Sequence, residues 1–250
     1  MKIKKTYISF RLAKGNGKFR CICAPLGDYK VLLKSMVSKI ANIMLLLDKE
    51  EISHGFMHQR SCITNALKHV GSDYVLTMDL SNFFDSVSID KVCDVLDEDQ
   101  IDACFVDGIA KQGLPTSPAI ANLAFRKADL AILKAFDERD MQCVYTRYAD
   151  DLTISFNNVK YVEYLPDIIR KIVIMHGFVV NESKTKLQKS ANGRFVITGV
   201  GVDKTGVYPT RKVLKKIRAA IYQGNNSSVK GLEEWAKCKA PRILDTKIMG

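Results

Sequence analysis

The sequence predicts an α+β fold, in which helices pack against a mainly antiparallel sheet. Apolar and polar residues alternate along 73–80, 143–148 and 152–156, with the period of two that marks half-buried strands. Apolar stripes with helical spacing separate these strands, most clearly along 117–136. The chain has 250 residues, of which 47% are hydrophobic, so it can bury a full core. This order of strands and helices is typical of layered α+β domains.

The N-terminal part begins with two predicted strands, 6–12 and 19–25, joined by a turn rich in Lys and Gly. A helix is predicted over 29–47, with Asp28 as its N-cap. Its apolar side chains recur every three or four residues and predict one buried face. The expected members of that face are Leu32, Met36, Ile40, Ile43 and Leu47.

The strand over 73–80 places its side chains on two different faces. Leu76, Met78 and Leu80 share the face that we expect to meet the core. Thr77 and Asp79 share the other face. Asp79 is therefore predicted to stand at the end of a strand, on the side away from the core.

The longest predicted helix, 117–136, has a clear start. Ser117 is the expected N-cap, and Pro118 stands at the first helical position, where proline is favoured. The strands 143–148 and 152–156 follow as a predicted hairpin. The apolar stripe of the helix is expected to contain Ile120, Leu123, Leu130 and Leu133.

The remaining chain contains further short elements. A helix is expected over 166–177 and a strand over 178–181. The Asn-Gly pair at 192–193 predicts a hairpin that joins 185–189 to 194–202. Beyond these, an amphipathic basic helix over 211–223, a loop at 225–228 and a short helix around Trp235 are expected.

The formal net charge of +11 indicates a polyanionic partner, either nucleic acid or an anionic membrane surface. The membrane alternative is weak, because the longest apolar run, 40–47, is far too short to span a bilayer. The basic N-terminus has no apolar signal-peptide core, and the seven cysteines have no disulfide-framework spacing. We therefore expect a cytoplasmic protein with reduced thiols and no membrane partner.

Two adjacent aspartates, Asp150 and Asp151, lie at the tip of the predicted hairpin. If its strands neighbour the strand that ends at Asp79, the three carboxylates converge on one edge of the sheet. Two divalent cations about 3.5–4 Å apart require such a cluster of oxygen ligands for phosphoryl transfer. The alternative is that each aspartate is an ordinary turn or strand-end residue, since turns favour Asp.

Several motifs, in this order, resemble those of reverse transcriptases, and specifically of bacterial retron reverse transcriptases. MDLSNFFDSV at 78–87 resembles their first-aspartate motif, KQGLPTSPAIANL at 111–123 their Gln-Gly/Ser-Pro motif, and YADD at 148–151 their YxDD motif. NALKH at 65–69 resembles the NAxxH of retron enzymes, and Ile-Thr-Gly at 197–199 stands where they commonly carry Val-Thr-Gly. The similarity covers roughly residues 6 to 220.

The resemblance implies a right-hand polymerase with an antiparallel-sheet palm, a basic fingers lobe and a short helical thumb remnant. It divides the chain into an N-terminal fingers region at 1–72, a palm at 73–208 and a thumb, short or truncated, at 209–250. A fingers-like segment is expected at about 88–115 within the palm. About 40 residues follow the palm, which is short for the thumb with which retron enzymes grip their RNA.

The resemblance also implies catalytic roles. Asp79 and Asp150 would bridge two Mg²⁺ ions, with Mn²⁺ as an alternative, and Asp151 would be the third carboxylate. The backbone carbonyl of Leu80 would be a minor metal ligand. Lys184 resembles the lysine that protonates or neutralises the leaving pyrophosphate, a task that suits an ammonium group.

Nucleotide-binding positions can be carried over in the same way. Phe84 resembles the steric gate that excludes a 2′-hydroxyl, while ordinary aromatic packing is the alternative for it and the expectation for Phe83. Gln112 and Gly113 match residues that contact the nucleotide and template, and Gly113 would let the backbone approach closely. Lys18 and Arg20 match the basic residues that hold the triphosphate, and the alternative is that they are solvated residues of an edge strand. The expected nucleotide-binding residues are Lys18, Arg20, Phe84, Gln112 and Gly113.

Contacts with RNA and DNA are expected from a separate set of residues. Tyr148 is expected to pack beside the primer end, with Arg147 on the opposite face of its strand. Basic side chains on the 211–223 helix would contact phosphates, so that binding would weaken with salt. The complete predicted set is Arg60, Asn65, His69, Tyr148, Lys212, Lys215 and Lys216.

The predicted function is therefore RNA-directed DNA polymerisation, a nucleotidyltransferase activity. The resemblance implies that dNTPs are polymerised on a structured non-coding RNA, from a 2′-hydroxyl of that RNA, to give branched single-stranded DNA. It also implies an effector protein and a role in anti-phage defence. Two alternatives stay open: another defence-associated reverse transcriptase without a retron RNA, and a catalytically silent palm that binds nucleic acid.

Overall fold

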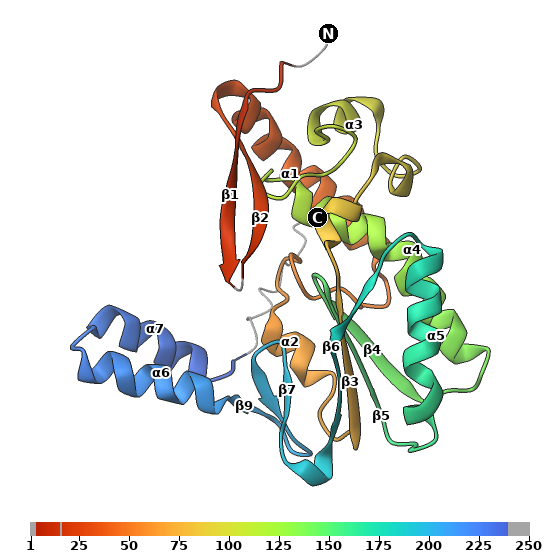
Figure 1. Ribbon diagram of the computed structural model, residues 1–250, viewed down its shortest axis with the longest axis vertical. Coiled ribbons are helices and arrows are strands. Elements are labelled where there is room, and N and C mark those ends of the chain that lie inside the picture. The colour runs from red at the N-terminus through yellow and green to blue at the C-terminus, as the bar shows by residue number, and fades with distance from the viewer. Residues whose placement is uncertain (1–3, 16, 240–250) are drawn as a thin grey trace, which may run out of the picture. The chain divides into compact units, whose positions relative to one another are not determined.

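A computed structural model describes residues 4–15 and 17–239, with the side chains of residues 15 and 18 excluded. The chain forms two compact units, each built from three segments (Figure 1). Within the described residues, unit 1 contains 4–51, 80–138 and 167–181, and unit 2 contains 52–79, 139–166 and 182–239. These interleaved units differ from three consecutive domains, so the division into fingers, palm and thumb stays a prediction. No helix among the described residues is long and apolar enough to cross a membrane.

Unit 1 contains a two-stranded antiparallel hairpin and most of the long helices. The two N-terminal strands are confirmed, and helices α1 and α4 pack against each other. One short 3₁₀ turn lies within the first-aspartate motif and a second follows it, and Phe83 of the first turn is buried against aromatic neighbours. Its elements are β1 (Tyr7–Gly15), β2 (Lys18–Pro25), α1 (Gly27–Leu47), η1 (Phe83–Ser86), η2 (Ile89–Lys91), α3 (Glu98–Cys104) and α4 (Ser117–Asp137).

Both predicted caps in unit 1 are displaced. Helix α1 begins at Gly27, so Asp28 lies in its first turn and is not its N-cap. The buried face of this helix is also rotated from the expected one, and shares only Ile40 with it. In α4 the N-cap position is Thr116, while the Ser117 hydroxyl donates to the carbonyl of Lys111 at 2.7 Å. Buried side chains of α1 are Tyr29, Leu33, Ile40 and Met44.

The main sheet has four strands in the order β4-β5-β3-β6 (Figure 1). These are β3 (Tyr74–Leu80), β4 (Cys143–Tyr148), β5 (Asp151–Phe156) and β6 (Val180–Lys189). Apart from the residues where β3 ends and β6 begins, they belong to unit 2. The predicted alternation of β3 is confirmed, because Leu76, Met78 and Leu80 are buried while Thr77 and Asp79 are partly exposed. This phase places Asp79 away from the core.

A second, three-stranded sheet and the short helix α2 (Cys62–Leu67) form another core within unit 2. The sheet contains β7 (Phe195–Ile197), β8 (Val200–Val202) and β9 (Val207–Pro209). The predicted hairpin at the Asn-Gly pair is wrong, because β6 pairs in the first sheet whereas β7 pairs with β8. Residues Ser190–Asn192 form a single 3₁₀ turn there. Backbone pairing with other strands therefore overrides the local turn signal.

Three further helices complete the described chain. Helix α5 (Tyr161–Met175) begins earlier than the sequence predicts and spans the boundary between the units. Helices α6 (Arg211–Tyr222) and α7 (Asn226–Ala236) pack against each other in unit 2. The expected loop at 225–228 is wrong beyond its first residue, because the Asn225 side chain caps α7 by accepting from Ser228 N.

Candidate active site

The pairing of β3 with β5 brings two of the predicted carboxylates together in unit 2. Asp79 on β3 is the direct cross-strand partner of Asp151 on β5. Tyr148 on β4 also faces Asp151, so Ala149 and Asp150 form a two-residue turn between these strands. Ala149 has a φ of 57°, a left-handed conformation that costs a non-glycine residue about 1–2 kcal/mol. The tight turn fixes Asp150 next to the facing pair.

The carboxylates are crowded, and the pKa of Asp151 reflects it. Burial, followed by the charges of Asp150 and Asp79, raises the pKa of Asp151 from 3.8 to about 6. Lys184 on β6 opposes this shift. Its Nζ donates to Asp79 Oδ2 at 2.8 Å, and that hydrogen bond raises the pKa of Lys184. One ammonium group therefore partly compensates a cluster of three carboxylates.

The donor set suits a hard divalent cation that a substrate helps to coordinate. In the described part of the chain, no three His, Cys, Asp or Glu side chains are grouped so that they could hold a metal ion. Mg²⁺ in polymerase-type sites is commonly held by one or two carboxylates together with substrate phosphates. The cross-strand partners Asp79 and Asp151 supply that number of carboxylates. The crowding of Asp151 is the strain that a bound cation would relieve.

The two residues before the turn differ in environment. Tyr148 is half-buried, and burial raises the pKa of its phenol. Arg147 lies on the opposite strand face, as expected, but is completely buried. Its guanidinium donates to Ser53 Oγ at 2.7 Å and to the Ala149 carbonyl at 3.1 Å. Sequence reasoning missed this buried arginine, because charged residues are seldom placed in the interior.

Two of the predicted nucleotide-binding residues lie in unit 1, beside strand β2. The Gln112 carbonyl accepts from Cys23 N at 2.8 Å. Gly113 has a φ of 107°, and an added Cβ would lie 2.7 Å from both Cys23 O and Ile22 Cγ2. The close approach that requires glycine here is thus to the β2 backbone. The predicted approach to a ligand stays a prediction.

The aromatic pair after β3 also lies in unit 1. Phe83 is only 3% exposed and packs against Phe125 and Phe178, which confirms its structural role. Phe84 is half-buried and meets Phe83 edge to face at a centroid distance of 5.8 Å. Leu80, whose carbonyl was predicted as a ligand, follows Asp79 directly and has a buried side chain.

Of the two predicted basic residues of the N-terminal hairpin, the structure describes the side chain of one. Arg20 is exposed on β2, opposite Leu12 of β1. Lys18 begins β2, but its side chain lies outside the described residues. The predicted lysines of α6, by contrast, are exposed along its length, as a nucleic-acid contact requires. They are Lys212, Lys215 and Lys216.

The expectation that Asn65 and His69 contact nucleic acid is contradicted by their burial. Both residues are 0% exposed. The imidazole of His69 bonds to Ser155 Oγ at 2.8 Å and to Thr146 Oγ1 at 2.7 Å, and burial lowers its pKa to about 3. Neutral His69 therefore ties β4 to β5. The amide of Asn65 has no hydrogen-bond partner in the described protein.

Arg60, another predicted nucleic-acid contact, is half-buried and makes a structural bond. Its Nη1 donates to the carbonyl of Ser53 at 2.7 Å. Ser53 and the nearby Gly55 were not predicted as site residues, although both lie against the end of β4. The sequence contains one hint. Gly55 stands outside any turn signal, two residues after the strand-like Ile52–Ser53 pair, and such a glycine often marks the close approach of another backbone.

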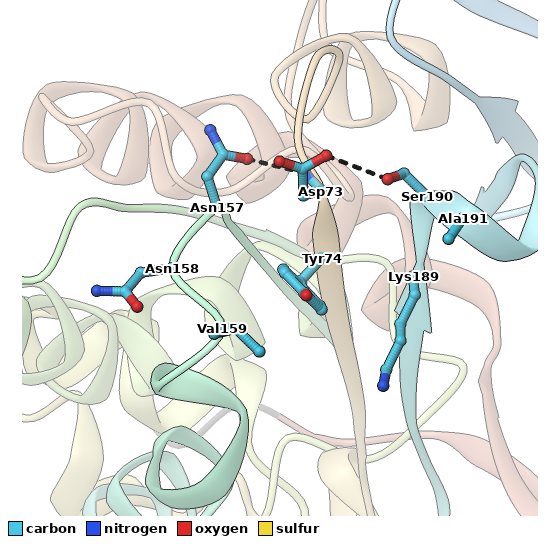
Figure 2. A pocket seen from close by; sticks show the side chains of 8 residues that line it. All are labelled: Asp73, Tyr74, Asn157, Asn158, Val159, Lys189, Ser190 and Ala191. Carbon is cyan, nitrogen blue, oxygen red and sulfur yellow. Dashed lines mark hydrogen bonds between the residues drawn. The ribbon is translucent and has the colours of Figure 1, made fainter.

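A hollow at the other end of the strands does not contain the carboxylate cluster. Figure 2 shows its lining, which comes from the start of β3, the segment after β5 and the end of β6. Its volume is about 480 Å³. Asp73, in its wall, is bonded by Ser190 Oγ at 3.1 Å and by Lys204 Nζ at 2.8 Å. The lining residues are Asp73, Tyr74, Asn157, Asn158, Val159, Lys189, Ser190 and Ala191.

Sequence comparison relates the chain to known enzymes. Residues 4–202 match the family described as reverse transcriptase (RNA-dependent DNA polymerase). The retron Ec86 reverse transcriptase of Escherichia coli is 32% identical over 87% of this chain and 70% of its own length. The retron Mx65 reverse transcriptase of Myxococcus xanthus is 32% identical over 87% of this chain, which spans only 56% of that relative.

Solved structures show the same fold at lower sequence identity. A foamy viral protease-reverse transcriptase bound to double-stranded DNA superposes with a TM-score of 0.52 at 20% identity. That match covers 87% of this chain and 33% of the viral one. An apo telomerase from Candida tropicalis gives a TM-score of 0.55 at 14% identity, covering 83% of this chain and 54% of its own.

Proposed function

Because the chain belongs to the reverse transcriptase family, and within it to the retron reverse transcriptases, we propose that it polymerises dNTPs on a structured non-coding RNA. The observation that carries this proposal is the cross-strand pair Asp79–Asp151 beside the Asp150 turn. Three carboxylates at one sheet edge, with a lysine bonded to one of them, have the composition that phosphoryl transfer needs.

The carboxylates would hold Mg²⁺, or Mn²⁺ in its place. When bound, two such ions supply electrostatic stabilisation of the attacking and leaving oxygens. Asp79 and Asp151 would each offer a carboxylate from facing strands, and Asp150 a third from the turn. The carbonyl of Leu80 would add a minor ligand. Lys184, whose ammonium is held beside Asp79, would donate a proton to the leaving pyrophosphate or neutralise it.

Nucleotide selection is assigned to residues of unit 1. Half-buried Phe84 would exclude a 2′-hydroxyl by steric clash, because its ring is held edge-on by buried Phe83. Gln112 and Gly113 would contact the incoming nucleotide, and Arg20 would pair with its triphosphate. The same resemblance assigns Lys18 to the triphosphate.

Nucleic-acid binding is assigned to exposed basic residues of α6 and to the end of β4. Lys212, Lys215 and Lys216 would contact phosphates without reading sequence. Tyr148 would pack beside the primer end. Arg60 would add a phosphate contact beside its bond to the Ser53 carbonyl. This binding is largely electrostatic, so affinity should fall steeply as salt rises.

The finer proposal is that the RNA also supplies the primer, through a 2′-hydroxyl, and that the product is branched RNA–DNA. We place this activity in the cytoplasm, with an effector protein and a role in defence against phage. Fingers, palm and thumb would correspond to 1–72, 73–208 and 209–250. Another defence-associated reverse transcriptase, or a silent nucleic-acid-binding palm, would give different products or none.

Primer extension tests the proposed chemistry. The purified chain and its Asp150→Asn variant are compared on an RNA template with a DNA primer, dNTPs and Mg²⁺. Extension by the wild type alone supports the proposal, whereas equally poor extension by both proteins would contradict it. Sequencing of nucleic acid that copurifies from the native host then distinguishes a branched RNA–DNA species from an unbranched DNA product.

A further inference from the structure

We propose that residues 52–55, which we call the brace, position the Ala149–Asp150 turn, and that Gly55 and Arg147 are positioning residues for catalysis. The inference rests on the proposed function, since it concerns the geometry of the same carboxylates. It assigns a role to a segment outside the motifs that carry the carboxylates themselves. All of these residues lie within unit 2.

The brace pairs with the end of β4 that leads into the turn. β4 is an outer strand of the four-stranded sheet. Next to it, Arg147 N donates to Ile52 O at 2.9 Å, and His54 N donates to Arg147 O at 2.7 Å. Ser53 and Arg147 thereby form a parallel bridge. This pairing satisfies the backbone of an edge strand two residues before the turn.

The side chain of Arg147 links the brace to the turn itself. It is fully buried, and its two terminal nitrogens donate in different directions. One donates to Ser53 Oγ at 2.7 Å, and the other to the carbonyl of Ala149 at 3.1 Å. Because a guanidinium is planar, these bonds fix the Ala149 carbonyl relative to the brace. That carbonyl belongs to the peptide group that precedes Asp150.

Gly55 brings the brace into direct contact with the backbone of the turn. An added Cβ would lie 2.5 Å from Ala149 N and 3.0 Å from the carbonyl carbon of Tyr148. Gly55 does not have a left-handed backbone, so its need for glycine is one of space. Backbone atoms cannot rotate away as the end of a side chain can. A methyl group at this position must therefore displace the turn or the brace.

The brace is held from its other side as well. His54 Nδ1 bonds Thr64 Oγ1 of α2 at 2.8 Å, and Arg60 Nη1 donates to the carbonyl of Ser53 at 2.7 Å. His69, two residues beyond α2, bonds both strands of the hairpin that carries the turn. The brace and the hairpin are thus fixed to the same short helical segment. A rigid support of this kind keeps catalytic groups in productive geometry.

Position matters at this turn because misplacing a reacting group by about 1 Å can reduce turnover about 10²-fold. A positioning role predicts a loss in kcat with little change in substrate or RNA affinity. A role in folding alone predicts that affinity, stability and turnover fall together. The two roles therefore differ in a measurable ratio.

The experiment compares Gly55→Ala with Gly206→Ala. Gly206 is a matched control in the same unit, because a Cβ there would meet its nearest atom at an ordinary 3.6 Å. Three quantities are measured: kcat for primer extension, Kd for an RNA–DNA template–primer, and deuterium uptake of the peptide covering 145–152. For Gly55→Ala we expect kcat to fall at least about 10-fold, Kd to stay within about twofold and uptake in that peptide to rise. Gly206→Ala should change none of them.

Unchanged kcat and uptake in folded Gly55→Ala would overturn the proposal. So would a joint loss of kcat and RNA affinity with increased uptake throughout the chain. If Gly55→Ala does not fold, Ser53→Ala, which removes the 2.7 Å bond from Arg147, is judged by the same criteria with a smaller expected loss of about threefold in kcat. A wild type that extends no primer refutes the proposed function, and uptake at 145–152 then decides the brace alone.

Discussion

Strand β3 has an aspartate at each end, and the two aspartates have opposite surroundings. Asp73, just before the strand, is bonded by Lys204 Nζ and by Ser190 Oγ, which lower its pKa. Figure 2 shows the bond from Ser190. Asp79, near the other end, faces Asp151. Burial and neighbouring carboxylates raise the pKa of Asp151 to about 6. One end is therefore electrostatically satisfied, whereas the other is crowded.

The difference separates structural acids from candidate catalytic ones. At Asp73 the protein supplies a cation and hydrogen-bond donors, so the carboxylate stabilises the fold without further partners. At Asp151 it adds carboxylates and burial, with Lys184 as the opposing charge. Titratable residues whose pKa is shifted by burial and neighbouring like charges concentrate at functional sites, because catalysis needs such shifted pKa values.

The largest expected effect is on catalysis at the crowded end. Asp79→Asn keeps the shape of the side chain but removes a charge that a divalent cation would require. We expect primer extension to fall at least about 10³-fold, corresponding to about 4 kcal/mol of transition-state stabilisation. Asp73→Asn, on the same strand, should extend within about threefold of wild type. Comparable losses in the two variants would remove the distinction between the ends.

A smaller loss is expected at the lysine of the same end. Lys184→Met removes the ammonium that bonds Asp79 at 2.8 Å, and should reduce the rate of nucleotide addition about 10²-fold. Lys186→Met is the control, because Lys186 is an exposed lysine two residues further along β6. Single-turnover extension measures both. If the control loses as much as Lys184→Met, net charge rather than the position of Lys184 explains the effect.

The smallest effect concerns the satisfied end. Because the folded-state pKa of Asp73 is lowered, its contribution to stability is present above about pH 4 and is lost as pH falls. Asp73→Asn should therefore lower Tm slightly at pH 7, with the difference shrinking towards pH 3. Thermal melts across this range measure it. A difference that grows on acidification would show that Asp73 is not a satisfied carboxylate.

Much of the site could be predicted from local sequence pattern. The alternation around Leu76 and Met78 sets the phase of β3 and so the exposed position of Asp79. The strands that flank Ala149 likewise predict the hairpin that carries Asp150. These features depend on side-chain period and turn position, which a single segment determines.

Features that depend on distant partners could not be predicted. Asn65 lies in the short helix α2 and His69 just beyond it. Nothing in their spacing shows that His69 is buried and hydrogen-bonded to the strand hydroxyls of Thr146 and Ser155. The Asn-Gly pair at 192–193 predicts a hairpin, but β7 finds its partner in β8. Position 55 requires a glycine only because the backbone of the turn at Ala149 packs against it and leaves no room for a Cβ.

The central claim is that the crowded end favours chemistry at the expense of stability, and Asp151→Asn tests it most directly. The folded-state pKa of about 6, against 3.8, means that stability from Asp151 is present at low pH and lost as pH rises through 6. At pH 7 without metal, the variant should therefore be more stable than wild type by up to about 3 kcal/mol, an advantage that shrinks towards pH 4. The same variant should lose at least about 10³-fold in primer extension with Mg²⁺. A variant that is less stable at pH 7, or that extends as wild type does, would contradict the account.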